Sequence, residues 1–211
     1  MAEVPAAGGY QTGVDKAAVR EVVENWALFR DSGRWDELAS VYTPDAIVHT
    51  TWFVGAASEF VRRSAELARR GSRSQHFIGA VSVEVSGSRA IAESRMMLLV
   101  RAVLDGVEVD VTCYGRFYDW FLRTDAGWQI RMRNGIYEKD RIDPVDPRAT
   151  LSLDAVKLAR YPQNCRHIAY VQASGGANIT LDLPTPGSEA LERLYAEGRG
   201  WLRGQSSKEK A

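Results

Sequence analysis

The chain of 211 residues contains few of the residues and patterns that mark metal, cofactor or export chemistry. It has two cysteines, Cys113 and Cys165, and three histidines, His49, His76 and His167, and their spacing is not that of zinc ligands. A phosphate-binding glycine loop and a GxSxG nucleophile motif are also absent from the sequence. We therefore expect no metal, no organic cofactor and no disulfide framework.

Long apolar runs and an excess of either charge are missing as well. The longest apolar run in the middle of the chain, residues 96–100, is far shorter than the ~20 residues that cross a bilayer. Lysine and arginine (27) balance aspartate and glutamate (27), without a basic tract. Clustered cations for nucleic acid or anionic membranes are thus lacking. The first residues resemble no signal peptide, so we expect a cytoplasmic protein that binds neither nucleic acid nor a membrane.

Helical periodicity dominates the first third of the chain. A composition of 45% hydrophobic and 26% charged residues is sufficient for a core, and the length favours one main domain. The predicted elements are a helix from Asp15, its expected N-cap, to near Asp31, a short helix from Trp35 that stops before Pro44, a strand over 46–53 and a helix over 60–68 that ends before Gly71.

Residues after Gly71 alternate with the period of two that is typical of strands. The predicted strands cover 75–85, 90–104, 107–122 and 128–138, and turns fall at 86–88, 105–106 and 125–127. Asp105-Gly106 is a strong hairpin signal, and strands of this length imply strong curvature. We expect an α+β fold, a cone-shaped barrel in which N-terminal helices pack on a strongly curved antiparallel sheet.

Three regions follow from this organisation: a flexible N-terminus (1–13), an α+β cone domain (14–141) and a C-terminal extension (142–211). The extension begins with a proline-punctuated linker and contains predicted helices near 153–161 and 188–202, an irregular stretch around 175–176 and a frayed end. It lacks a core of its own, so we expect it to pack on the sheet or on a neighbouring subunit.

Asp31 and His76 are the candidate catalytic residues. A curved sheet with helices on one face encloses an apolar pocket of ligand size, and a buried ionisable side chain there is costly unless it is paired. Asp31 lies at the C-terminal end of a helix, where the dipole disfavours a carboxylate, and His76 begins a strand. Local sequence alone also fits a turn aspartate and a structural histidine.

A family resemblance adds to this local reading. The segments FRDSGRWDEL (29–38), followed by Pro44, SQHFIG (74–79) and DAGW (125–128) resemble scytalone dehydratase and the SnoaL-like branch of the nuclear-transport-factor-2-like superfamily, over about residues 14–140. The resemblance implies a cone-shaped α+β fold and an Asp-His pair at Asp31 and His76 that acts without metal or cofactor. A carboxylate on one imidazole nitrogen leaves the other free to accept a proton from a substrate.

The chain departs from scytalone dehydratase outside this pair. Scytalone dehydratase also has two tyrosines, a second histidine, an asparagine and a serine in its site. In this chain the matching places hold other residues: Arg30, Thr50, a residue near Val100, Phe117 and Gly115. The resemblance therefore implies a type of reaction and not scytalone as the substrate. Phe117 is retained as a candidate substrate contact.

Four further residues are candidates for substrate binding. His49 is a second acid or base, or caps the core, and Trp52 and Phe53 stack on an aromatic substrate or belong to the core. Asn134 shares strand parity with Trp128, Ile130 and Met132, so it faces the pocket if they do. By the same parity, Arg131 and Arg133 are expected at solvent or at an interface.

The function that these observations favour is a cofactor-independent lyase that eliminates water from a hydrophobic, aromatic or polycyclic small molecule. Retro-aldol release of an aldehyde such as formaldehyde, or isomerisation, fits the same pair of residues. A non-catalytic reading also stands, as an assembly subunit like the β subunits of aromatic-ring dioxygenases or as a ligand carrier. An apolar outer sheet face predicts a homo-oligomer, either a dimer or a trimer.

Overall fold

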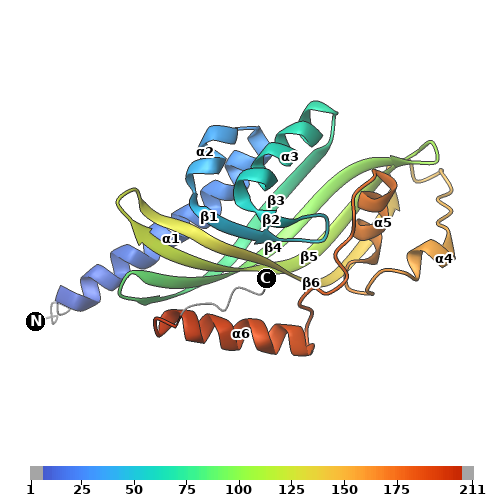
Figure 1. The fold of residues 1–211 in the computed structure, drawn as a ribbon. Coiled ribbons are helices and arrows are strands. Elements are labelled where there is room, and N and C mark those ends of the chain that lie inside the picture. Colours follow the sequence, from blue (N-terminus) through green and yellow to red (C-terminus); the bar gives the residue numbers. More distant parts are fainter. Residues whose placement is uncertain (1–6, 206–211) are drawn as a thin grey trace, which may run out of the picture.

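A computed structural model describes residues 7–205 and shows one curved, six-stranded sheet with helices on both faces (Figure 1). The first half contains α1 (Ala7–Ser32), α2 (Trp35–Ser40), β1 (Tyr42–His49), β2 (Val54–Ala56) and α3 (Ala57–Arg69). The long strands follow as β3 (Arg73–Ser86), β4 (Arg89–Leu104), β5 (Val107–Thr124) and β6 (Gly127–Pro144). The C-terminal helices are α4 (Ala155–Leu158), α5 (Arg166–Ser174) and α6 (Glu189–Leu202). The fold class is α+β, as expected.

The sheet has the strand order β2-β1-β6-β5-β4-β3. The antiparallel meander of β3 to β6 is confirmed, and the turn at Asp105-Gly106 has positive φ at both residues, 48° and 82°. A wholly antiparallel sheet is wrong, because β1 runs parallel to β6. In the described residues β2 and β3 remain at the two edges, so the sheet is curved but does not close into a barrel.

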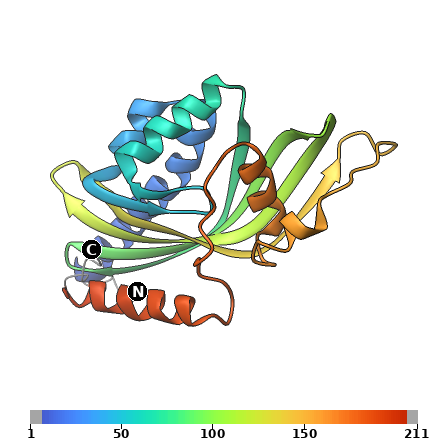
Figure 2. The ribbon, with the colours of Figure 1, turned by 45° about the vertical axis from the view of Figure 1, so that its right-hand side comes forward.

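Two apolar layers hold the helices on opposite faces of the sheet (Figures 1 and 2). On the concave face, α1, α3 and α5 contribute to one core that includes Trp26, Phe60 and Ile168. On the convex face, α6 packs through Leu191, Leu194 and Trp201 on residues of β4, β5 and β6. Trp201 stacks on Trp120 with ring centroids 5.6 Å apart. The C-terminal helices thus pack on both faces of the sheet.

The N-terminal boundaries differ from the sequence-based ones. Helix α1 begins at Ala7, so residues 7–13 are helical, while residues 1–6 lie outside the described part. Asp15 does not cap the helix: its carboxylate accepts a hydrogen bond from Trp128 Nε1 at 3.3 Å and pairs with Arg123, both on the sheet. The strand predicted over 46–53 begins at Tyr42, and β2 was not predicted.

The C-terminal region is more ordered than predicted. Strand β6 continues to Pro144, three residues beyond the expected domain boundary, and α5 replaces part of the irregular stretch. Helix α6 is capped by the Ser188 side chain, which accepts from the backbone N–H of Leu191. Residues 206–211, expected to be frayed, lie outside the described part. None of the described helices is long and apolar enough to cross a membrane.

A β-bulge in β6 decides which side chains reach the concave face. Trp120 pairs with Met132 whereas Phe121 pairs with Ile130, so Arg131 is an extra residue on β6. An extra residue reverses the alternation of faces beyond it. Ile130 lies in the concave core, but Met132 packs against the α6 layer. The parity expected for this strand is therefore wrong after Ile130.

Candidate active site

Asp31 and His76 form a hydrogen-bonded pair on the concave face. Nδ1 of His76 lies 2.8 Å from Oδ1 of Asp31, and the other carboxylate oxygen accepts the backbone N–H of His76. Because a carboxylate only accepts, Nδ1 carries the proton and Nε2 has a free lone pair. The His76 side chain is 9% exposed and the Asp31 side chain is 18% exposed. The pair expected from the sequence is thus assembled across 45 positions of the chain.

The end of α1 positions the carboxylate. Gly33 has a φ of +73°, and the backbone N–H of Arg34 donates to the carbonyl of Phe29 at 2.9 Å, the bond that closes a Schellman motif. Asp31 therefore lies in the last helical turn, where α1 packs against β3. The two hydrogen bonds from His76 compensate for the unfavourable helix dipole at that position.

Burial keeps the imidazole neutral. Desolvation lowers the pKa of His76 below 6.5; Asp31 acts in the opposite direction, and the positive charges of Arg30 and Arg133 lower it further. At neutral pH the ring is therefore uncharged, with Nε2 as a base. This is the protonation state that general-base catalysis requires.

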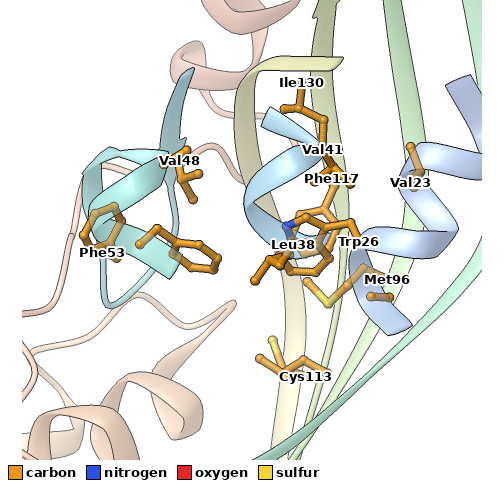
Figure 3. Packing of buried hydrophobic residues seen from close by; sticks show 14 of the residues in the cluster. Val23, Trp26, Leu38, Val41, Val48, Phe53, Met96, Cys113, Phe117 and Ile130 are labelled. Carbon is orange, nitrogen blue, oxygen red and sulfur yellow. The ribbon is translucent and has the colours of Figure 1, made fainter. Parts of the chain in front are cut away.

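Aromatic rings surround the imidazole. Trp26 contacts His76 edge to face with ring centroids 5.0 Å apart, and Phe117 lies 6.3 Å from His76 and 5.2 Å from Trp26. Figure 3 shows Trp26 and Phe117 packed together in the core. Phe117, expected as a substrate contact, is thus beside the candidate base.

Trp52 and Phe53 belong to the same aromatic group. Phe60 of α3 lies 5.4 Å from Trp52, 5.6 Å from Phe53 and 6.2 Å from Trp26, measured between ring centroids. Phe53 is buried, and Trp52 is half-buried. The rings from Trp52 to Trp26 therefore form one aromatic group in the core of the concave face, and this group reaches His76.

Arg133 and Asp119 form a buried ion pair next to these rings. Nε and Nη2 of Arg133 donate to the two carboxylate oxygens of Asp119 at 2.8 and 2.6 Å, and neither side chain is exposed. The Arg133 guanidinium lies 4.0 Å from the ring centroid of Trp26 and 4.3 Å from that of Phe117. Its Nη1 is buried and has no hydrogen-bond partner.

Strict alternation along β6 does not predict this pair. It places Arg133 at solvent or at an interface, because it does not include the bulge at Arg131. One signal for the pair is available in the sequence. Asp119 and Arg133 have opposite charges, lie in a strongly apolar hairpin and are register partners on β5 and β6. That signal depends on the register, which the bulge shifts.

His49 and Asn134 do not face the concave side. They are neighbours in the β1–β6 register, and Asn134 also pairs with Tyr118, which packs in the α6 layer. His49 is near Glu197 of α6, whose charge opposes the lowering of the His49 pKa by burial. The bulge accounts for the face on which Asn134 lies. Because β1 pairs in parallel with β6, His49 lies beside Asn134 on the same face. Neither residue therefore lies on the face that holds Asp31 and His76, contrary to the strand parity expected for Asn134.

A second Asp-His pair has a structural explanation. Oδ1 of Asp140 lies 2.8 Å from Nδ1 of His167, and Oδ2 accepts the backbone N–H groups of His167 and Ile168 at 2.7 and 2.8 Å. Asp140 thus caps the first turn of α5 from a neighbouring strand. Among the described residues, no group of three or more His, Cys, Asp or Glu side chains is arranged to hold a metal ion.

Comparison with known proteins identifies the family. The SnoaL-like domain matches residues 12–134, more than half of the chain. This protein belongs to the SnoaL-like family. A PEP2-like protein and pea pathogenicity protein 2, both of Fusarium vanettenii, are each 30% identical over 203 residues, covering 91% of this chain and 87% of the relative. That coverage extends beyond residue 134, so the likeness includes part of the C-terminal extension.

Solved structures share the fold at low sequence identity. A putative scytalone dehydratase from Novosphingobium aromaticivorans has a TM-score of 0.53 at 16% identity, covering 66% of this chain and 96% of that structure. A hexachlorocyclohexane dehydrochlorinase (LinA) of type 2 has a TM-score of 0.53 at 15% identity, covering 67% and 95%. At these identities the likeness concerns the fold.

Proposed function

We propose that this SnoaL-like protein is a lyase in which His76, paired with Asp31, removes a proton from a hydrophobic small molecule. The observation that carries the proposal is the geometry of the pair: a neutral imidazole with Nδ1 bonded to a carboxylate at 2.8 Å and Nε2 unbonded, set among aromatic rings. Proton transfer by these groups requires neither a metal nor an organic cofactor.

The proposed elimination is balanced by one proton transfer in each direction. Nε2 of His76 takes the proton from a carbon next to a carbonyl or phenol, and the C–H electron pair forms the new double bond as the C–O bond of the leaving group breaks. Asp31 stabilises the imidazolium that results, and the imidazolium returns the proton to the departing hydroxyl, which leaves as water. Dehydration is the same type of reaction as the eliminations named for the two fold neighbours.

Arg133 is suited to stabilise the developing negative charge. Its buried Nη1 has no partner, and its guanidinium contacts the same two rings, Trp26 and Phe117, that contact His76. A preorganised donor at an enolate or phenolate oxygen contributes roughly 10²–10³ in rate. Asp119 holds the guanidinium in place through two hydrogen bonds. In this proposal Arg133 is the electrophilic group and Asp119 positions it.

The rings favour an aromatic or polycyclic substrate. Trp52, Phe53 and Phe60 extend the aromatic group away from His76, and flat apolar ligands gain from stacking on aromatic rings. Removal of an O–H proton instead of a C–H proton would convert the elimination into retro-aldol release of an aldehyde, so the test must separate these outcomes.

A homo-oligomer stays a prediction. It was expected from the apolar outer face of the sheet, and α6 covers part of that face.

The test is turnover of a panel of hydroxylated aromatic and polycyclic compounds by the purified protein, followed by mass spectrometry. Loss of 18 mass units identifies dehydration and loss of 30 identifies release of formaldehyde. H76A and D31N are expected to lower turnover by roughly 10²- to 10⁴-fold. H49A is the matched control, because His49 is a partly buried histidine on the opposite face of the sheet.

Full activity in either dyad variant, or an equal loss in H49A, would contradict the mechanism. Circular dichroism of each variant separates lost chemistry from lost folding. If no compound is turned over and a large partner protein co-purifies from the native host, the assembly-subunit reading replaces the lyase.

A further inference from the structure

A cleft that Asp31 helps to line opens beside the Asp31-His76 pair. It has a volume of about 280 Å³ and lies where the end of α1 meets the connection between α3 and β3. The residues of its lining that matter here are Arg30, Asp31, Trp35, Ser72, Arg73 and Ser74. His76 and the rings around it are not among the lining residues, and Ser72, Arg73 and Ser74 supply polar groups at the α3–β3 side of the cleft.

In the described residues no carboxylate is hydrogen-bonded to the guanidinium of Arg30; burial lowers its pKa, and the nearby charge of Asp31 acts in the opposite direction. The Nε atom of Arg30 is buried without a hydrogen bond, and among the described residues no side chain forms an ion pair with its guanidinium. The group lies 6.0 Å from the ring centroid of Trp35, a long contact for a cation–π interaction. Arg133, which is fully buried, has a bidentate carboxylate. Arg30 is partly buried, and its buried Nε has no such acceptor, so a complementary anion from outside the chain is expected.

The remaining charges of the cleft favour an anion. Asp31 is the negative group, and both of its oxygens already accept hydrogen bonds from His76. Arg73 adds a second positive charge; its Nη1 donates to the carbonyls of Ala68 and Ser72, which holds the side chain over the cleft rim. With two arginines and one aspartate, the lining has an excess of one positive charge.

We propose that this cleft binds a small oxyanion, a carboxylate or phosphate group, between the guanidinium of Arg30 and the hydroxyls of Ser72 and Ser74. A planar guanidinium matches the two oxygens of such a group, and serine hydroxyls supply further donors. The site goes beyond the proposed lyase reaction and does not depend on it, because binding is measurable without turnover. The oxyanion is either free in solution or part of the substrate.

The experiment titrates the purified full chain with inorganic phosphate and, separately, with acetate. Binding is followed by calorimetry and by the ¹H–¹⁵N resonances of arginine Nε–H groups. One saturable site is expected, with the Nε–H resonance of Arg30 among those that shift. R30Q is expected to weaken binding by about tenfold or more, the effect of losing a charge-assisted bidentate contact. R30K, which retains the charge, is the second variant if R30Q does not fold.

R34Q is the matched control. Arg34 lies four residues further along, is about half-exposed and is already paired with Glu37 at 2.9 Å. It is expected to leave binding unchanged. Non-saturable shifts for both anions, or equal weakening by R34Q, would overturn the proposal. If a substrate is found, its kinetics distinguish the two sources of the oxyanion. An increase of KM by phosphate or acetate with unchanged kcat assigns the oxyanion to the substrate, whereas binding without an effect on KM assigns it to a free anion. Both results agree with the proposed site.

Discussion

Replacement of Asp119 by alanine is expected to destabilise the protein by about 3–5 kcal/mol, because it leaves a buried cation without its counterion. Asp119 and Arg133 are both fully buried, and two hydrogen bonds of 2.8 and 2.6 Å join them. The guanidinium is enclosed by the rings of Trp26 and Phe117. Without Asp119 the guanidinium would be buried with no counterion, so the expected loss of stability is in the upper range for single substitutions.

A second Arg-Asp pair in the sheet provides the control. Arg101 and Asp110 are also register partners and also form two hydrogen bonds, of 2.9 and 2.8 Å, but their side chains are 51% and 49% exposed. The geometry is matched and only the burial differs. Exposed pairs contribute little, so D110A is expected to leave stability nearly unchanged.

Urea denaturation followed by tryptophan fluorescence is the assay. With an m-value of about 2 kcal/mol per M, a loss of about 4 kcal/mol moves the midpoint by about 2 M. Equal, small shifts for D119A and D110A would refute the reasoning that burial determines the value of the pair. A further variant, D119L/R133M, removes both charges and is expected to recover much of the loss, because apolar replacement of a whole buried pair is often neutral.

Three other results are expected. The pKa of His76 is below its unfolded value of 6.5, so the unfolded chain binds the proton more tightly; stability and kcat/KM should both fall as the pH drops below 6.5, and an acid limb above 6.5 would contradict this. D140A removes the acceptor of three hydrogen bonds to α5 and is expected to cost about 2–3 kcal/mol, with loss of amide protection in α5 measured by hydrogen exchange; unchanged protection there would refute the capping role. G198A, ordinarily neutral or stabilising in a helix, is expected to destabilise by about 1–3 kcal/mol, since a Cβ would lie 2.8 Å from Cε1 of Tyr118; a raised melting temperature would show that α6 does not pack tightly on the sheet.

Much of the architecture could be predicted because it is encoded locally. Helical spacing located α1, α2 and α3, and alternation with glycine turns located the four long strands, because periods of 3.6 and 2 follow from backbone geometry within each segment. Asp31 and His76 were predicted through their motifs, and the structure joins them. Helix α5 was missed because its apolar residues contact the sheet without forming a long periodic pattern.

What the sequence alone determined is most of the elements, though not β2 or α5, and the two residues of the hydrogen-bonded pair, Asp31 and His76. Tertiary structure decided which face each side chain occupies. One extra residue in β6, at Arg131, moves Arg133 into the core and Asn134 away from it, and the parallel pairing of β1 with β6 does the same for His49. Strand register depends on contacts between segments that are distant in the chain, and a shift of one residue exchanges the two faces without changing the local pattern. The charged groups beside His76 therefore became visible only in the folded sheet.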